Sequence, residues 1–142
     1  MADAGLKTRP VGASATMGRT GFPHITSATG GTIEIVTGVS QAGFNPLDLL
    51  YASLSACLAM SARIAASRLG VLDKLVEVTA EVTGEKAAVE PSRVEKFSIH
   101  FRIVGDFDDA TRHAIARAAE DEICTVSNTI QGNPTFSTVV SG

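Results

Sequence analysis

The chain has 142 residues, a length that suits one domain able to bury a hydrophobic core. Apolar residues make up 44% of the sequence and charged residues 19%, which argues against a disordered chain. The net charge is −3 without a basic stripe, so we expect neither nucleic acid nor an anionic membrane as a partner. Residues 1–16 contain no apolar signal segment, and we therefore expect a cytoplasmic protein.

The N-terminal part of the chain is predicted to form β structure. Residues 11–37 are interrupted by glycine-containing breaks at 18–21 and 28–31, and Gly30-Gly31 is typical of a hairpin turn. Residues 32–37 are rich in β-branched side chains and are predicted to form a strand, which a loop follows.

A long helix is predicted over residues 46–69. Asn45 suits the N-cap, Pro46 suits the first helical position, and Asp48 places negative charge in the first turn. Gly70 suits the stop. The segment is apolar almost all round but contains charged residues and serines, so we expect a buried core helix rather than a membrane span.

Residues 75–83 alternate between apolar and polar side chains, which predicts a half-exposed strand. Its apolar face is expected to carry Val76, Val78, Ala80 and Val82. Residues 94–104 are predicted to form the next strand and to pair with it as a hairpin across a polar connection.

The last third of the chain is predicted to be helical until shortly before its end. Residues 106–122 suit a helix capped by Asp106 or Asp108, and residues 124–130 suit further helical turns ended by Gly132. Residues 135–140 are predicted to form a final strand. The inner stripe of the first of these helices is expected to be Ala110, Ala114, Ile115 and Ala118. No repeat or linker divides the chain, so residues 1–142 are predicted to form one α+β domain.

Cys57 and Cys124 are the two cysteines of the chain. Without a signal peptide they do not indicate a disulfide framework, and two buried, inert thiols are the simplest alternative to a reactive pair. Cys57 lies inside the apolar helix, where burial raises a thiol pKa. Cys124 lies at the start of a short helix, whose N–H groups stabilise a thiolate. The local sequence therefore favours Cys124 as the more acidic thiol.

Other candidate residues indicate no further chemistry. His24, His100 and His113 share no metal-ligand spacing with each other or with the cysteines, so we expect neither a metal nor another cofactor. No phosphate-binding loop and no nucleophile elbow is present. The helix serines Ser53, Ser55 and Ser61 are interpreted as small packing residues.

Three segments resemble a known family. The stretch from Asn45-Pro46 to Ser55-Ala56-Cys57 is similar to the first cysteine helix of the OsmC/Ohr family, which holds the osmotically inducible and the organic hydroperoxide resistance proteins. Residues 123–128, Ile-Cys-Thr-Val-Ser-Asn, resemble its second cysteine motif. Residues 15–21 resemble the stretch that supplies the family's active-site arginine, here Arg19. The predicted order of strands and helices also agrees with the family.

The resemblance implies an OsmC-like fold, in which antiparallel sheets wrap around long central helices in an intertwined homodimer. It also implies a thiol peroxidase for organic hydroperoxides. Cys57 would attack the peroxide and become a sulfenic acid, Cys124 would condense with it to a disulfide, and Arg19 would stabilise the Cys57 thiolate. A dithiol reductant of the lipoyl or thioredoxin type would reopen the disulfide.

Two positions depart from the family pattern. Hydroperoxide resistance proteins have a glutamate directly after the Asn-Pro pair, which holds the arginine, whereas this chain has Leu47 there and an acid one residue on, at Asp48. Asp48 is the candidate partner of Arg19, although one residue turns a helix by about 100°. Thr125 stands where a proline is usual. These departures leave two alternatives open, an OsmC-like protein that binds a small apolar ligand and a redox sensor.

Overall fold

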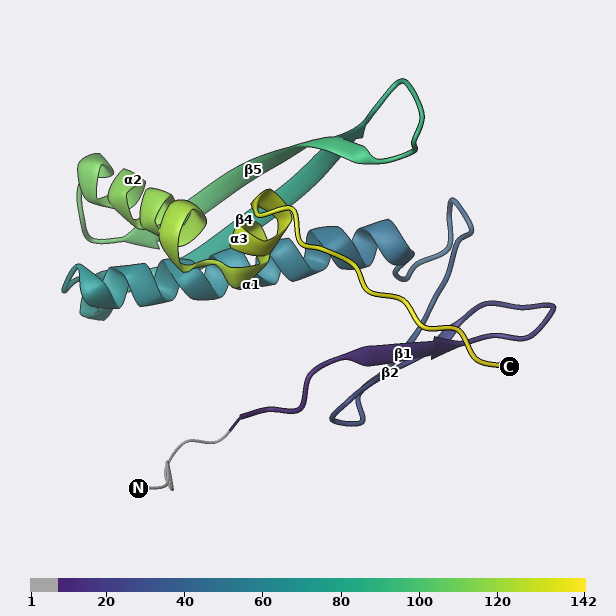
Figure 1. Ribbon diagram of the computed structural model, residues 1–142. Coiled ribbons are helices and arrows are strands. Elements are labelled where there is room, and N and C mark those ends of the chain that lie inside the picture. Colours follow the sequence, from purple (N-terminus) through teal and green to yellow (C-terminus); the bar gives the residue numbers. More distant parts are fainter. Residues whose placement is uncertain (1–7) are drawn as a thin grey trace. The chain divides into compact units, whose positions relative to one another are not determined.

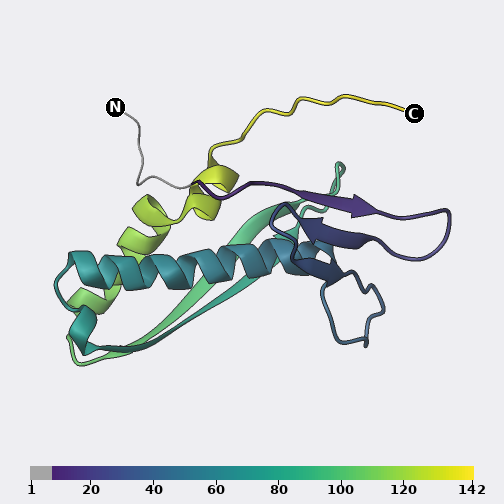
Figure 2. The same cartoon turned by 90° about the horizontal axis from the view of Figure 1, so that it is seen from below.

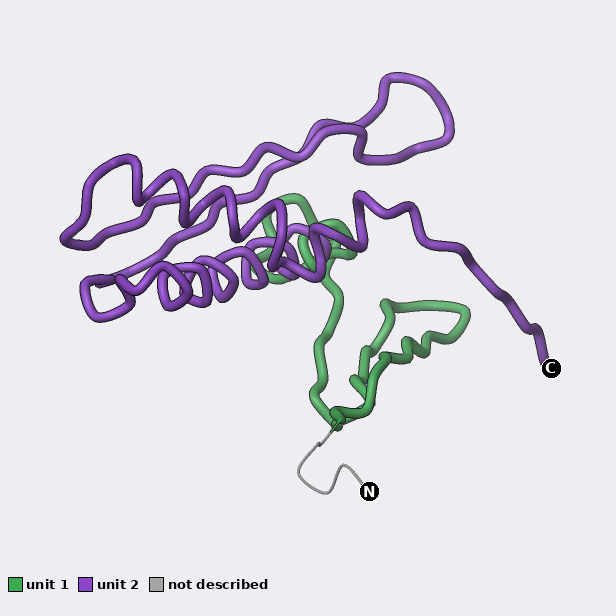
Figure 3. The backbone as a smooth tube through the Cα atoms, turned by 60° about the vertical axis from the view of Figure 1, so that its left-hand side comes forward, with its two compact units in different colours: residues 1–49 green, residues 50–142 purple. Residues whose placement is uncertain are grey.

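The structure is a computed structural model that describes residues 8–142. It is an α+β structure, and Figure 1 labels its main elements. The chain divides into two compact units, residues 1–49 and 50–142, which Figure 3 colours separately and which we describe one at a time. The single domain expected from the sequence stays a prediction. The elements are β1 (Ala13–Thr16), β2 (His24–Ser27), β3 (Thr32–Glu34), α1 (Pro46–Arg68), η1 (Leu72–Lys74), β4 (Leu75–Lys86), β5 (Val94–Gly105), α2 (Asp109–Ala118), η2 (Ala119–Ile123) and α3 (Thr125–Gln131).

The first unit contains an antiparallel sheet in the order β1-β2-β3. The turn between β2 and β3 is the one predicted, and Gly30 adopts φ +98° there, a conformation that favours glycine. Strand β3 is shorter than expected because the chain leaves the sheet after Glu34. Ile35 then forms a single parallel bridge with Phe44.

Helix α1 begins and ends within one residue of its predicted bounds. At its start, Asn45 Oδ1 accepts from the Asp48 N–H at 2.7 Å, and Asp48 Oδ2 accepts from the Asn45 N–H at 3.0 Å. This reciprocal pair satisfies two N–H groups that a helix terminus leaves unpaired. At the other end Gly70 adopts φ +75°, and the Val71 N–H donates to the Ala66 carbonyl at 2.9 Å.

One face of α1 is buried within the chain, and the opposite face is not. The buried residues are Leu54, Leu58, Ser61, Ala62, Ala65 and Ala66. Met60 is 58% exposed and Ile64 is 43% exposed, so the expected burial on all sides is not reached in a single chain. By length and hydropathy alone α1 could cross a membrane, but the core helix of a globular protein meets the same criteria. The absence of a membrane partner stays a prediction.

Strands β4 and β5 form the predicted hairpin, which runs along α1 in Figures 1 and 2. Val78, Ala80 and Val82 lie half-buried on its helix-facing side. Val76 was expected beside them but is 76% exposed, because the register shifts between Leu75 and Glu77. A shift of one residue moves a side chain to the other face of a strand.

The outer face of the hairpin is polar. Acidic side chains on β4 approach basic side chains on β5 in three cross-strand contacts, each with an N···O distance of 3.5–3.6 Å: Glu77–Arg102, Glu81–His100 and Glu85–Lys96. Pairs at such exposed positions contribute little stability. They identify this face as the solvent side of the sheet.

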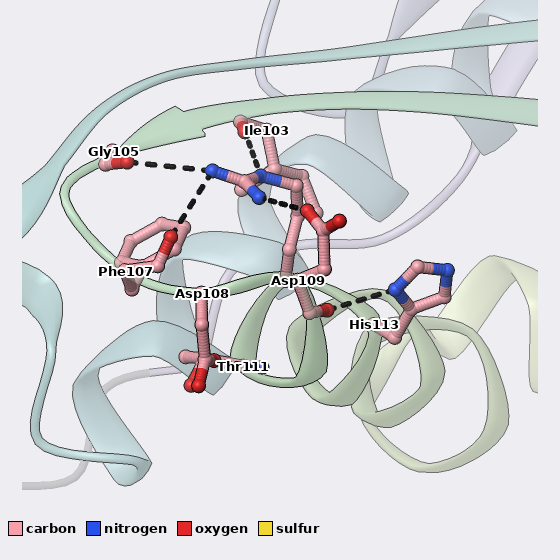
Figure 4. Close-up of polar contacts among 8 residues, drawn as sticks. Ile103, Gly105, Phe107, Asp108, Asp109, Thr111 and His113 are labelled. Carbon is pink, nitrogen blue, oxygen red and sulfur yellow. Dashed lines mark hydrogen bonds and ion pairs between the residues drawn. The ribbon is translucent and has the colours of Figure 1, made fainter.

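Arg112 forms hydrogen bonds that connect the start of α2 to the end of β5 (Figure 4). Its Nε donates to the Ile103 carbonyl at 2.8 Å, and a terminal nitrogen donates to Asp109 Oδ1 at 2.6 Å. Asp108, one of the two caps expected, accepts from the Thr111 N–H at 2.8 Å. These contacts place α2 against the core that α1 and β5 share.

Helix α2 is shorter than predicted, because it gives way after Ala118 to a π-helical turn, Ala119–Ile123. Ile115 of α2 and Ala119 of the π turn are fully buried. Ala110 and Ala114 were expected on the inner stripe but are exposed. That expectation is wrong for these two residues because the inward face of α2 follows Thr111, Ile115 and Ala118, and Ala110 and Ala114 lie about 100° to one side of it.

The predicted final strand is also wrong for this chain. Residues 135–140 have no regular structure, and Phe136, Val139 and Val140 are 93%, 91% and 88% exposed. A strand needs a neighbouring strand to receive its backbone hydrogen bonds, and in residues 8–142 no strand pairs with this segment. High β propensity alone is therefore not enough to order it.

Candidate thiol active site

The second unit brings the two cysteines together. Cys57 comes from the middle of α1 and Cys124 from the residue before α3, and both are reduced. They share an apolar cluster with Leu54 and Leu58, in which Cys124 is fully buried and Cys57 is half-buried. That the two cysteines lie close together could not be derived from their spacing in the sequence.

The backbone around Cys124 is held in place on both sides. Its N–H donates to the Ala119 carbonyl at 2.9 Å, which closes the π turn. Its Sγ accepts from the Ser127 N–H at 3.3 Å, so the thiol is the N-cap of α3. The side-chain amide of Asn128 also donates to the Glu122 carbonyl at 3.2 Å. Short π segments often occur at functional sites.

The environment of Cys57 favours the thiolate. Desolvation raises the pKa of Cys57, but this effect is outweighed by hydrogen bonds from the Val126 N–H, the Cys124 thiol, the Ser61 hydroxyl and the Thr125 N–H. The net pKa lies below the ordinary value for a cysteine. Donors that point at a sulfur atom stabilise its negative charge, as the first N–H groups of a helix do.

The environment of Cys124 acts in the opposite direction. Desolvation, a hydrogen bond to Cys57 and the negative charge of Cys57 all raise its pKa, and the N–H groups of Ser127 and Val126 compensate in part. The expectation that Cys124 is the more acidic thiol is therefore wrong. The N–H groups of Thr125 and Val126 at the start of α3 also stabilise the thiolate of Cys57 on the other helix, a relation that no local pattern could reveal.

Ser61 is a site residue that the sequence analysis missed. It was interpreted as a small packing residue and is indeed buried, but a hydrogen bond from its side chain is also one of the causes that lower the pKa of Cys57. A signal was present, because residues four apart on a helix lie on one face. A polar side chain at that spacing from a candidate nucleophile therefore lies next to it on the helix.

The other expected site residues belong to the first unit. Arg19 lies exposed in the loop between β1 and β2, and its approach to Cys57 stays a prediction. Asp48 holds the Asn45 N–H at the start of α1. Among residues 8–142 no ion pair within 4.0 Å includes either Arg19 or Asp48, so their pairing also stays a prediction. Leu47 is half-buried in the first turn of α1.

A pocket of 310 Å³, lined by both apolar and polar side chains, lies beside the cysteine cluster. Four residues of that cluster form its apolar wall: Leu54, Phe97, Ile99 and Ile130. Glu120, Ser127 and Gln131 supply its polar groups. In the described part of the chain no group of three or more His, Cys, Asp or Glu side chains could hold a metal ion. The chemistry available to the described residues of this site is therefore that of two adjacent thiols next to an apolar surface.

The geometry of this site agrees with a match between the chain and a family model, that of the OsmC-like proteins, over residues 38–139. This chain belongs to the OsmC-like family. The match includes α1, the hairpin and both cysteine segments, which in this OsmC-like chain carry the site. It does not include Arg19. No curated protein sequence matches the chain.

Solved structures share the fold of this OsmC-like protein. An organic hydroperoxide resistance protein OsmC from Legionella pneumophila is 21% identical, with a TM-score of 0.73 over 90% of this chain and 93% of that one. One from Elizabethkingia anophelis is 24% identical, with a TM-score of 0.68 over 89% and 91%. The organic hydroperoxide resistance protein OhrB of Bacillus subtilis is 25% identical, with a TM-score of 0.60 over 88% and 93%.

Proposed function

We propose that this protein is a cysteine-based peroxidase that reduces organic hydroperoxides. The observation that carries the proposal is the pairing of a thiol of lowered pKa, Cys57, with a second thiol of raised pKa, Cys124, in one apolar cluster. Attack on a peroxide needs a thiolate, and the sulfenic acid that results needs a nearby thiol to protect it from further oxidation.

The reaction proceeds in three steps. The Cys57 thiolate attacks the terminal oxygen of the hydroperoxide, the O–O bond breaks, and the alkoxide leaves as an alcohol after taking a proton. The Cys124 sulfur then attacks the sulfenic sulfur of Cys57, an S–S bond forms, and water leaves. A dithiol of the lipoyl or thioredoxin type reduces this disulfide by thiol–disulfide exchange and is itself oxidised.

The unequal acidity of the two thiols suits this order of events. Cys57 must be ionised at rest, whereas Cys124 must remain a thiol until the sulfenic acid has formed. Cys124 loses the negative charge of its neighbour once Cys57 is oxidised, and that charge is one cause of its raised pKa. Oxidation of Cys57 therefore lowers the pKa of Cys124 and activates it for the second step.

Arg19 completes this site in the proposal, as the cation beside the Cys57 thiolate and the polarised peroxide. Arg19 comes from the part of the chain that carries β1 to β3, and Asp48 is the candidate carboxylate to orient it. Leu47, where hydroperoxide resistance proteins have a glutamate, leaves Arg19 with a less direct partner. We expect slower peroxide reduction than in a chain with the glutamate.

The protein is proposed to act as an intertwined homodimer in the cytoplasm. Met60 and Ile64 form an exposed apolar stripe on α1, and the tail residues Phe136, Val139 and Val140 lie in solvent in the single chain. Burial of such surfaces favours association, at about 25 cal/mol per Å² of apolar area. A second copy of the chain is the occupant that the family implies.

A peroxide-consumption assay tests the function. We expect the wild-type protein to consume an alkyl hydroperoxide in the presence of dihydrolipoamide, and the Cys57→Ser variant to consume none. The apolar wall beside the cysteines favours alkyl over hydrogen peroxide, because each buried methylene contributes about 0.8 kcal/mol. If no alkyl hydroperoxide is consumed with either a lipoyl or a thioredoxin-type dithiol, the peroxidase proposal is wrong.

The 310 Å³ pocket supports a second candidate function, the binding of a small apolar ligand with the cysteines as a redox switch. In that case the wild-type protein would undergo one oxidation without turnover. Its affinity for an apolar probe would differ between the reduced and the disulfide form. The same assay, followed by a binding titration of both forms, separates the two functions.

A further inference from the structure

We propose that Ser61 is a third residue of the reactive centre, whose hydroxyl donates to the Cys57 sulfur and stabilises its thiolate. The proposal deepens the proposed function, since it concerns the same thiol. Its test needs no peroxide, so the two can fail separately.

Helix geometry places the two side chains together. Ser61 follows Cys57 by four residues within α1, so both lie on one face of the helix. The Cα–Cβ bonds of a helix tilt toward its N-terminus, and a side chain covers the turn before its own Cα. The Ser61 hydroxyl therefore lies over the turn that carries Cys57. Ser61 is 3% exposed, so water competes little for this contact.

The other serines of α1 show what is different about Ser61. Ser53 donates to the Leu50 carbonyl at 2.8 Å, and Ser55 donates to the Ala52 carbonyl at 3.0 Å. Both hydroxyls are thus satisfied by their own helix. Among the hydrogen bonds of residues 8–142, none joins the Ser61 hydroxyl to a helix carbonyl, so this hydroxyl remains available to the Cys57 sulfur. A hydrogen bond from the Ser61 side chain is also one of the causes that lower the pKa of Cys57.

The Ser61 hydroxyl stabilises the charged form of the thiol. Cys57 lies in an apolar cluster, where desolvation raises its pKa, so each donor that offsets desolvation counts. A hydrogen bond to an ionised acceptor is roughly twice as strong as one between neutral groups. Ser61 also stays on α1 together with Cys57, whereas the donors at Thr125 and Val126 lie on α3. The Ser61 hydrogen bond is therefore the one that survives any movement between the two helices.

The experiment is the pH dependence of Cys57 alkylation by iodoacetamide in the full chain, with the modified peptide followed by mass spectrometry. In Ser61→Ala we expect the profile to move to higher pH and the rate at neutral pH to fall about threefold to tenfold. Ser61→Thr, which keeps a hydroxyl, restores most of the wild-type rate. Ser55→Ala is the matched control on the same helix, and its profile stays that of the wild type.

Two outcomes would overturn the proposal. One is a Ser61→Ala profile that superimposes on the wild type, and the other is an equal shift in Ser55→Ala. The peroxide assay is read independently. A shifted Ser61→Ala profile in a protein that consumes no hydroperoxide supports the role of Ser61 and contradicts the peroxidase. Normal turnover with an unshifted profile does the reverse.

Discussion

The Ser127 N–H donates to Cys124 Sγ at 3.3 Å, so the thiol that starts α3 is also the thiol that meets Cys57. The Cys124 sulfur thus both caps α3 and lies beside the Cys57 thiol. This arrangement explains why N–H groups at the start of α3 stabilise the Cys57 thiolate. With Cys124 in the N-cap position, the N–H groups of Thr125 and Val126 are among the groups that lower the pKa of Cys57.

The first prediction concerns the order of thiol reactivity. The pKa of Cys57 is lowered and that of Cys124 is raised, so Cys57 forms its thiolate at lower pH than Cys124. As pH rises from 5 to 10 the alkylation rate of Cys57 should rise first, with a midpoint below that of a free cysteine, about 8.5. Mass spectrometry of both peptides measures this. Faster alkylation of Cys124 at any pH in this range would show the order to be wrong.

The second prediction separates the two roles of Cys124. Serine is a good N-cap, so Cys124→Ser should keep α3 and most of the folding stability, while Cys124→Ala loses the cap and should cost about 1 kcal/mol or more. Urea unfolding measures the difference. Under hydroperoxide both variants should oxidise Cys57 once and then stall, with a sulfenic acid that dimedone traps. If Cys124→Ser already prevents the first oxidation, Cys124 is not simply a resolving thiol.

The third prediction tests Arg19. A positive charge beside a thiolate lowers its pKa, and one unit corresponds to a tenfold change in the ionisation constant. Arg19→Ala should therefore lower the alkylation rate of Cys57 at neutral pH by about tenfold. Arg117→Ala, on the exposed side of α2, is the control. An unchanged rate in Arg19→Ala would identify Arg19 as a loop residue without a role at the thiol.

The fourth prediction concerns the exposed stripe of α1. If a second copy covers Ile64, then Ile64→Glu buries an unpaired carboxylate in the interface and should convert the dimer to monomer or unfold it at micromolar concentration. Thr79→Glu, on the polar face of the hairpin opposite Arg102, should leave the dimer intact. Light scattering coupled to size exclusion measures both. A wild-type protein that is a stable folded monomer would contradict the proposed homodimer, whose interface should bury on the order of 2,000 Å² or more.

The sequence predicts a local element well where the residues that start and end it agree with the pattern of apolar residues between them. Helix α1 has Asn45 and Pro46 at its start and Gly70 after its end, and its bounds were confirmed within one residue. The β4–β5 hairpin followed from alternation alone. The exposure of Val76 did not, because a register shift depends on the partner strand.

The sequence pattern could not predict contacts between segments that lie far apart in the chain. The acidity of Cys57 depends on N–H groups of α3, and the segment 135–140 needs a strand neighbour that the described chain does not provide. Ser61 stands between these cases. Its position relative to Cys57 is local, but its importance depends on the desolvation around that thiol, which the tertiary structure creates.

The π turn at Ala119–Ile123 has a consequence for how this part of the chain tolerates insertions and deletions. Each residue of an α-helix advances the chain by about 100°, and this turn sets the rotation at which Cys124 leaves α2. Loss or gain of one residue here would carry the thiol about a quarter of the way round, away from Cys57. A change of side chain at exposed Asp121 or Glu122 would leave that rotation intact. Length, more than composition, is what this segment has to preserve.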